Sequence, residues 1–354
     1  MTFDKRVVDS HVHIVNDEPA LERMLNEMRL MGINDITIQS LAAHYKYDFT
    51  QNIYALALKS RLTDMRVRVF ASVHELDELA DIPYLEQAQT LLDIGADGFK
   101  FIQMKPDVRR RVGKGICHES YDSLFSMLEE RRVPVTIHTA DPKIFWDPDK
   151  VSDSARKQGW FYGDGQHMSY EEHLRELFRM LDKHPRLKAI LAHFCFLDED
   201  RDRAAWVLDR YPEVRLDLTP HPAMIRSFSS DVEGWRDFFI KYADRLVFGT
   251  DADNVRSRNI NIYKTVYYAL RYDDDELLMP AYYQQDYMRT MHLPDLVVEK
   301  IASGNFLKLV GEEPKPLNSE LMMRAAKEIL GRVCNSERNA LGIKWLKSFI
   351  AANG

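Results

Sequence analysis

The sequence predicts an α/β fold, a closed (β/α)₈ TIM barrel with a C-terminal helical extension. Eight short runs rich in apolar and β-branched residues recur along the chain, and helix-like stretches separate them. Strands that alternate with helices in this way pair in parallel through crossover helices. A chain of 354 residues accommodates one barrel of about 250 residues together with roughly 100 residues of loops and extensions.

The eight expected strands cover residues 7–14, 35–41, 66–73, 97–103, 133–139, 187–194, 214–219 and 246–250. Several of them are apolar on both faces, as a parallel sheet covered on both sides requires. Apolar stripes at helical spacing lie between the runs, at residues 21–28, 121–131, 174–181 and 232–242. Because no GxGxxG pattern follows the first run, a closed barrel is favoured over an open dinucleotide-binding sheet.

The expected organisation has two parts, a barrel over residues 1–311 and a helical extension over residues 312–354, packed on or beside the barrel. Pro314 and Pro316 mark the start of the extension. No low-complexity tract and no linker rich in Pro, Gly or Ser divides the rest of the chain. The extension offers a surface for self-association, so a homo-oligomer is one expected state.

Composition narrows the partners and the compartment. The formal net charge of −7 makes the chain a poor candidate for binding nucleic acid or an anionic membrane by bulk electrostatics. Its start lacks the apolar run of a signal peptide, and no stretch approaches the roughly 18 apolar residues of a membrane helix. Cys117, Cys195 and Cys334 fit neither a disulfide framework nor a CxxC metal motif. We therefore expect a cytoplasmic protein whose partner is a small molecule.

Four histidines and one aspartate lie where a parallel barrel carries its chemistry, at the carboxyl ends of strands. His11 and His13 alternate along the first run, so a strand points both into the barrel mouth. His138 and His193 lie at the ends of the fifth and sixth runs, and Asp251 follows the eighth. Each histidine alone is more often structural than a ligand. Together, the five residues indicate a site for a divalent metal ion.

This order of residues, completed by a lysine on the fourth run, resembles the amidohydrolase superfamily. Within it, the chain most resembles the amidohydrolase-related branch, which includes metal-dependent hydrolases and non-oxidative decarboxylases. The segment 301–311, IASGNFLKLVG, is similar to the closing helix of that branch. The resemblance spans about residues 5–311. Its motifs are specific for the fold and the metal and poor at naming a substrate.

The resemblance implies that His11, His13 and His138 are metal ligands. Asp251 would complete the site or approach the water on the metal, and His193 would polarise the substrate or move a proton. Zinc lowers the pKa of bound water to about 7, and a carboxylate within hydrogen-bond distance can orient that water and pass on its proton. One Zn²⁺ is the expected cofactor, while Mn²⁺, Fe²⁺ and Co²⁺ also suit such ligands.

Lys100 is open to three interpretations. In binuclear relatives a carbamylated lysine on this strand bridges two metals, whereas a plain cation near the site and a structural role are the alternatives. The branch commonly carries a Lys-x-His-Pro stretch here, and this chain has Ile102 and Gln103 after Lys100 instead. We favour the plain cation, which makes Lys100 a catalytic candidate beside Asp251 and His193.

Further polar residues near strand ends are weaker candidates. His44, His74 and His221 follow the second, third and seventh runs, and a surface or supporting role is favoured for each. The arginines at 109–111 follow the fourth run. The planar fork of arginine suits a carboxylate substrate, but a three-arginine run is more typical of a solvated loop.

The segment 139–170 after the fifth run is long and rich in aromatic residues. Loops longer than about 15 residues in a compact domain are usually functional or disordered, and this one is too aromatic for simple disorder. We expect it to cover the metal and to supply a stacking wall for a ring-shaped substrate. The alternative is an excursion packed against a neighbouring subunit.

Three functions are therefore considered. The favoured one is a metal-dependent hydrolase of a small anionic or cyclic organic molecule. The second is a lyase, a non-oxidative decarboxylase of an aromatic or unsaturated acid, which would use the same ligands. The third is a non-enzymatic binding barrel, and the complete ligand set argues against it.

Overall fold

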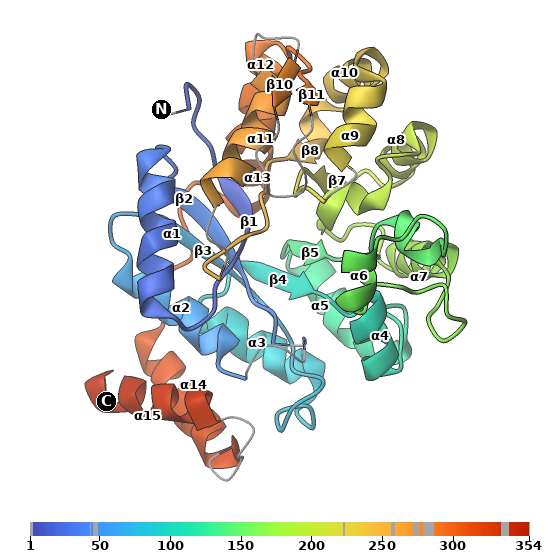
Figure 1. The fold of residues 1–354 in the computed structure, drawn as a ribbon. Helices are drawn as coiled ribbons and strands as arrows, with labels where there is room; N and C mark the ends of the chain where they lie inside the picture. The colour runs from blue at the N-terminus through green and yellow to red at the C-terminus, as the bar shows by residue number, and fades with distance from the viewer. Residues whose placement is uncertain are drawn as a thin grey trace.

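The computed structural model describes residues 3–42, 44, 49–221, 224–255, 259–271, 276–278, 287–333 and 340–353. A parallel sheet of nine strands curls into a TIM barrel at its centre, and helices surround it (Figure 1). The fold class predicted from the sequence is thus confirmed. Cys117 and Cys195 are free thiols, and Cys334 lies outside the described residues.

Each of the eight predicted runs contains a strand. The strands are β1 Asp9–His13, β2 Asp35–Gln39, β3 Arg66–Ala71, β4 Gly98–Phe101, β5 Val135–Ile137, β6 Ala189–Leu191, β7 Val214–Asp217, β8 Leu246–Val247 and an additional β9 Ala252–Asp253. The order in the sheet, β8-β7-β6-β5-β4-β3-β2-β1-β9, follows the chain, as consecutive βα units produce. All eight strands are shorter than the predicted runs, and the residues that leave the strand ladder at the carboxyl ends of β5 and β6 include His138 and His193.

The barrel closes where the chain passes from β8 to β9. β9 pairs in parallel with β1, so β8 and β9 are the first and the last strand in the order of the sheet. Ser10 strengthens the closure, since its backbone N–H and its hydroxyl both donate to Phe248 O, at 3.2 and 2.6 Å. Gly249 lies at this crossing, and a Cβ there would come within 2.9 Å of Thr219 Oγ1. Glycine is therefore the residue that lets the two strands approach.

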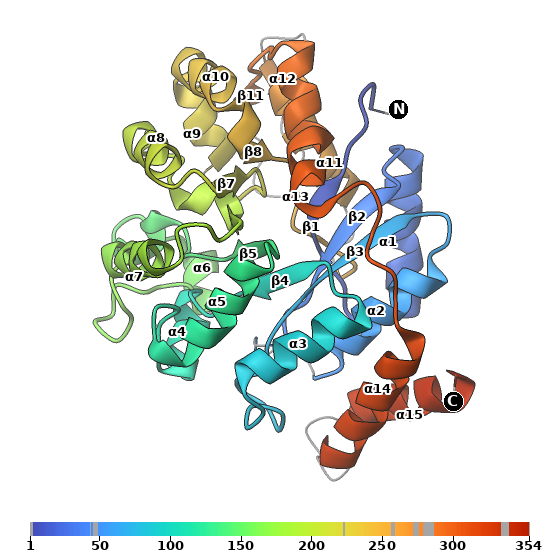
Figure 2. The same cartoon turned by 180° about the vertical axis from the view of Figure 1, so that it is seen from behind.

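Helices cover the outside of the barrel, as Figure 2 shows from behind. They are α1 Glu18–Leu30, α2 Gln51–Arg61, α3 Tyr84–Ile94, α4 Pro106–Val112, α5 Asp122–Glu130, α6 Asp153–Lys157, α7 Tyr170–Lys183, α8 Arg201–Arg210, α9 Met224–Ser230, α10 Val232–Lys241, α11 Asn259–Arg271, α12 Asp295–Glu299 and α13 Asn305–Val310. The start of α7 is a capping box, in which Ser169 and Glu172 satisfy each other's backbone N–H groups. A short antiparallel pair, β10 Glu276–Leu278 and β11 Tyr287–Arg289, stands apart from the barrel sheet.

The chain ends in two helices, α14 Ser319–Val333 and α15 Ala340–Asn353, which pack on each other beside α2 and α3 (Figure 1). Trp345 of α15 meets Tyr54 of α2 edge to face, with ring centroids 5.2 Å apart. The connection to α14 is anchored on the barrel, because Lys315 N donates to Asp97 Oδ1 at 2.7 Å. The division of the chain at residue 311 stays a prediction. In the described part of the chain, no helix is both long enough and apolar enough to cross a membrane.

Candidate metal centre

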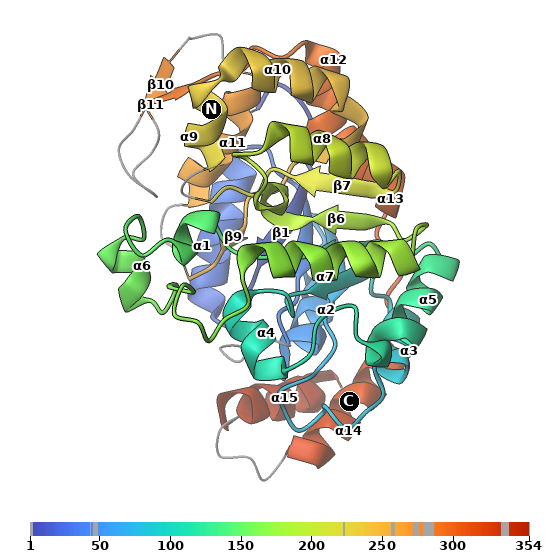
Figure 3. The same ribbon diagram turned by 90° about the vertical axis from the view of Figure 1, so that its right-hand side faces the viewer.

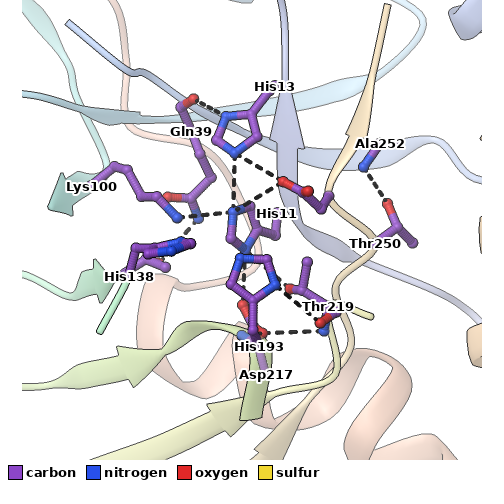
Figure 4. A network of polar contacts seen from close by, with 12 residues as sticks. His11, His13, Gln39, Lys100, His138, His193, Asp217, Thr219, Thr250 and Ala252 are labelled. Carbon is purple, nitrogen blue, oxygen red and sulfur yellow. Dashed lines mark hydrogen bonds and ion pairs between the residues drawn. The ribbon is translucent and has the colours of Figure 1, made fainter. Parts of the chain in front are cut away.

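The carboxyl ends of β1, β5 and β6 and the link between β8 and β9 bring the five predicted residues together. His11 and His13 are the third and fifth residues of β1 and point to the same side, as alternation along a strand requires (Figure 4). His138 follows β5, His193 follows β6, and Asp251 precedes β9. All four histidines are buried. The spacing in the sequence therefore located one site.

Three of these side chains converge on one point. His11 Nε2 and His13 Nε2 lie 3.2 Å apart, and Asp251 Oδ1 lies 3.1 Å from His13 Nε2 and 3.8 Å from His11 Nε2. Among the described residues, this is the group of histidine, cysteine and carboxylate atoms that falls within 4.8 Å of one another and could hold a metal. His138 and His193 lie beside this group and outside it.

Hydrogen bonds behind the two histidines of β1 fix their tautomers. His11 Nδ1 lies 2.9 Å from Asp217 Oδ2, and His13 Nδ1 lies 2.7 Å from Gln39 O. A carboxylate and a carbonyl only accept, so each Nδ1 carries the hydrogen and each Nε2 carries a lone pair. Burial lowers the pKa of His11 well below its ordinary value, which keeps this ring neutral.

The donor set fits a divalent metal ion. Two imidazole lone pairs and a carboxylate oxygen that face one another repel each other unless a cation lies between them. Neutral imidazole nitrogen and carboxylate oxygen are ligands of Zn²⁺ and of the neighbouring first-row metals. His11, His13 and Asp251 are therefore the residues that would hold the ion, with His138 next to them.

Asp217, which the sequence did not single out, supports both sides of the site. Its Oδ2 accepts from His11, and its Oδ1 accepts from the backbone N–H groups of His193 at 2.7 Å and Thr219 at 3.1 Å. Burial raises the pKa of Asp217, although His193 and Lys100 act in the opposite direction. A carboxylate behind a ligating imidazole orients the ring and raises its basicity. The sequence signal that could have found Asp217 was its position as the last residue of β7.

His193 stands in a left-handed turn, the 3₁₀ segment η3 Ala192–Phe196. His193, Phe194, Cys195 and Phe196 all have φ between 55° and 56°. Such a conformation costs about 1–2 kcal/mol per residue for side chains other than glycine, so packing must hold it. Phe194 is buried among the rings of α9 and α10, and Tyr170 Oη donates to Phe196 O at 2.5 Å.

The ring of His193 faces the two neighbouring histidines. Its centroid lies 5.7 Å from that of His11 and 4.9 Å from that of His138. His193 Nδ1 lies 3.2 Å from Thr219 O and must donate to it, so Nε2 carries the lone pair. Burial lowers the pKa of His193 well below its ordinary value. The ring is thus a neutral proton acceptor beside the three converging ligands.

His138 is held from the opposite ring edge. Its Nε2 lies 3.2 Å from Asp141 Oδ1, and Lys105 Nζ contacts both oxygens of this carboxylate at 2.8 and 2.7 Å. Burial raises the pKa of Asp141, but Lys105 and His138 outweigh it and hold the pKa well below its ordinary value. Burial also lowers the pKa of His138, so a neutral ring presents Nδ1 to the site. No pattern in the sequence marked Asp141.

Lys100 lies inside the cluster. Its Nζ is 2.9 Å from His11 Nε2, the same nitrogen that faces His13 (Figure 4). The side chain is buried, and burial lowers the pKa of Lys100 to about 8. A cation at this position fits the interpretation favoured from the sequence, and the same proximity is what a bridge between two metals would need.

The weaker candidates have other partners. The arginine run lies in helix α4 and not in a solvated loop, and Arg109 pairs with Glu176 through two hydrogen bonds of 3.1 and 3.0 Å. His74 Nδ1 lies 2.6 Å from Asp77, and His221 Nε2 lies 2.8 Å from Asp198. His44 is buried after β2.

The segment 139–170 contains local structure. It includes the 3₁₀ segment η2 Lys143–Trp146 and helix α6, where the sequence predicted a long loop. Its aromatic rings pack on one another: Phe145 is stacked on Trp160 with ring centroids 5.8 Å apart, and Trp146 is tilted against Tyr162 with ring centroids 5.0 Å apart. Helix α6 of this segment lies on the side of the molecule to which the carboxyl ends of β6 and β7 point (Figure 3). Its predicted role in covering a substrate stays a prediction.

The sequence matches a family model described as Amidohydrolase over residues 8–311. The chain belongs to the amidohydrolase family. It is therefore an enzyme of the metal-dependent hydrolase and lyase type, and the resemblance seen in the sequence is confirmed. The family match covers the strands, the site and the closing helix, and it leaves the specific reaction and the metal open.

Solved structures agree on the fold. An uncharacterised TIM-barrel protein from Bordetella bronchiseptica is similar at 14% identity with a TM-score of 0.53, over 86% of this chain and 98% of that one. IDCase from Metarhizium anisopliae is similar at 13% identity with a TM-score of 0.52, over 87% of this chain and 97% of that one. 4-Oxalomesaconate hydratase from Rhodopseudomonas palustris is similar at 12% identity with a TM-score of 0.51, over 92% of this chain and 99% of that one. A search of curated proteins finds no match to the sequence.

Proposed function

We propose that this amidohydrolase is a hydrolase of a small anionic or cyclic organic molecule and that it holds one divalent metal, most simply Zn²⁺. The observation that carries the proposal is the position of Asp251. Its carboxylate lies among the ligand nitrogens of β1, and its side chain is 19% exposed against 0% for His11. One group is thus close to the metal ligands and accessible from the barrel mouth, where a substrate would enter.

The ion supplies Lewis-acid chemistry and a lowered pKa for water when it is bound. The protein groups supply the proton transfers. In hydrolysis, the oxygen of water bonds to the carbonyl carbon of the substrate, and the bond to the leaving group breaks. Asp251 takes the proton from the attacking water and delivers it to the leaving group. His193 Nε2, which carries a lone pair, is a second acceptor beside it.

The rest of the site positions the substrate and limits water. We expect the aromatic rings of the segment 139–170, which pack on one another, to supply an apolar wall for a cyclic substrate. Excluding water strengthens the electrostatic interactions inside the site. A small-molecule partner is also in keeping with the net charge of the chain.

One observation favours a second candidate, the non-oxidative decarboxylase. Lys100 places a cation next to the ligand nitrogen of His11, where it would complement a substrate carboxylate. In that reaction the bond between the substrate and its carboxylate breaks, carbon dioxide leaves, and the carbon atom takes a proton that Asp251 or His193 first accepts from solvent. Both candidates use the same residues and differ in the fate of water.

Isotope labelling separates the two candidates. The metal-loaded enzyme is screened on a panel of small cyclic amides, esters and aromatic acids, and the active compound is turned over in ¹⁸O-labelled water and in D₂O. Hydrolysis places ¹⁸O directly in a newly formed carboxylate. A product that is one carbon smaller and carries deuterium on carbon would contradict the hydrolase proposal and support the lyase.

A further inference from the structure

We propose that Asp141 is a positioning residue that fixes the tautomer of His138 and makes the order of the aromatic segment 139–170 depend on metal binding. The inference rests on the proposed function in one respect, that His138 contributes to the metal site. It goes beyond that function by coupling the metal to a distant part of the loop.

His138 is held through a different ring nitrogen from the other three histidines of the site. His11, His13 and His193 each donate from Nδ1 to an oxygen behind the ring. His138 instead uses Nε2, which lies 3.2 Å from Asp141 Oδ1. Lys105 Nζ donates to both oxygens of this carboxylate, which accepts from His138 as well, so Nε2 carries the hydrogen and Nδ1 carries the lone pair that a metal needs.

Asp141 lies between three elements. Lys105, the residue that precedes α4, contacts both carboxylate oxygens, and Tyr162 Oη donates to Oδ2 at 2.5 Å. Asp141 is 4% exposed, so these contacts are made away from bulk water and are worth more than surface ones. One carboxylate therefore joins β5, the start of α4 and the middle of the loop.

Tyr162 anchors the aromatic segment. Tyr162 is buried, its backbone N–H donates to Phe145 O at 2.9 Å, and its ring contacts Trp146 and His167, each at 5.0 Å. Trp146 Nε1 in turn donates to Met168 O at 2.8 Å. The parts of the loop before and after α6 are thus both held by Tyr162, whose hydroxyl donates to Asp141.

The consequence follows from linkage. A cation bound to a ring nitrogen of His138 makes Nε2–H a stronger donor to Asp141, which tightens the contact that carries Tyr162. Coupling between two sites is reciprocal, so an ordered loop must also raise the affinity for the metal. Removing the hydroxyl of Tyr162 should break this coupling while the ligands themselves stay in place.

The test measures the loop directly and needs no substrate. Protein freed of metal by a chelator is digested with trypsin with and without ZnCl₂, and cleavage is followed at Lys150 and Lys157, which are exposed in the loop. In the wild type, zinc should slow this cleavage by about tenfold, within the usual range of coupling between sites. Tyr162→Phe should bind about one equivalent of zinc and lose most of the protection.

Two variants complete the design. Asp141→Asn should lose the protection and also weaken zinc affinity by about 10- to 100-fold. Tyr54→Phe is the matched control, because Tyr54 Oη also donates to a carboxylate, that of Glu18, and both residues lie outside the segment 139–170. Zinc-dependent protection in Tyr162→Phe equal to that of the wild type would overturn the inference alone. A wild type that binds no zinc would instead overturn the proposed function as well.

Discussion

The two sides of the metal centre are built in different ways. On the side of β1 and β9, three ligand atoms converge within 4.8 Å, and the strand pairing that closes the barrel holds them. On the side of β5 and β6, the ring centroids of His138 and His193 lie 4.9 Å apart, and residues that follow the strands hold both rings in place. The first side is fixed by the sheet and the second by loops. Substitutions on the first side should therefore act on metal binding and on the turnover that needs it, and substitutions on the second side should also change the order of the loop.

The largest effect is expected at Asp251 on the strand side. Asp251→Asn keeps the size of the side chain, removes a charged ligand and abolishes the proton acceptor. We expect turnover to fall by about 10³-fold, the range of general acid–base catalysis. Steady-state kinetics on the substrate found by screening measures this. Near wild-type turnover in Asp251→Asn would count against both candidate reactions.

A second prediction concerns the pH dependence of the free energy of unfolding that His173, next to the segment 139–170, contributes. His173 of α7 is fully buried, its ring lies 5.9 Å from that of Trp146, and neither ring nitrogen has a hydrogen-bond partner among the described residues. Burial lowers the pKa of His173 to about 4, from 6.5 in the unfolded chain. Between these values the unfolded state binds more protons, so stability falls as the pH falls.

Replacing the ring should remove this dependence. The loss in the free energy of unfolding that is attributable to His173 amounts to at most about 3 kcal/mol between these two pKa values, at 1.36 kcal/mol for each pKa unit. Urea unfolding of the wild type and of His173→Leu at several pH values measures it. The free-energy difference between the two proteins should shift in favour of the variant as the pH drops from about 6.5 to about 4. A difference that does not change with pH would show that the ring is not held neutral.

A third prediction sharpens the comparison at the residue that both sides share. Asp217 orients His11 through Oδ2 and the backbone of His193 through Oδ1. Asp217→Asn should weaken zinc affinity by about 10- to 100-fold, as loss of a partner behind a ligand does. Competition with a chromophoric chelator measures the affinity. An unchanged affinity would show that the two sides hold the metal without this link.

The smallest effect is expected at Lys100. If this residue is a plain cation beside the site, Lys100→Met should relieve repulsion toward the metal and raise zinc affinity a few-fold. The stoichiometry should stay near one equivalent. A wild type that holds two equivalents and falls to one in the variant would instead make Lys100 a bridge between two metals.

Sequence reasoning worked best where geometry follows from strand periodicity. Alternation along β1 placed His11 and His13 on one face, and the rule for strand ends brought the other three residues to the same mouth. It missed Asp217 and Asp141, because a carboxylate behind a histidine is recognised by its tertiary partner and not by its spacing. The left-handed turn at residues 193–196 was also beyond reach, since its residues do not favour that conformation and packing imposes it.

Local structure in the long loop could not be predicted for a related reason. Helix α6 is five residues long, too short for a periodic pattern, and the aromatic residues that precede and follow it pack on one another across the chain. Closure of the barrel by β9 was missed because two residues give no strand signal. These features depend on contacts between segments, which a single sequence does not display.

The central claim, that β1 and the β8–β9 link hold one divalent metal, is tested most directly by elemental analysis. Protein purified without chelator should contain about one equivalent of a divalent metal such as zinc per chain. The His11→Ala and His13→Ala double variant should contain none while circular dichroism shows an intact fold, because the two converging imidazoles are gone. Full metal retention in that double variant would contradict the account.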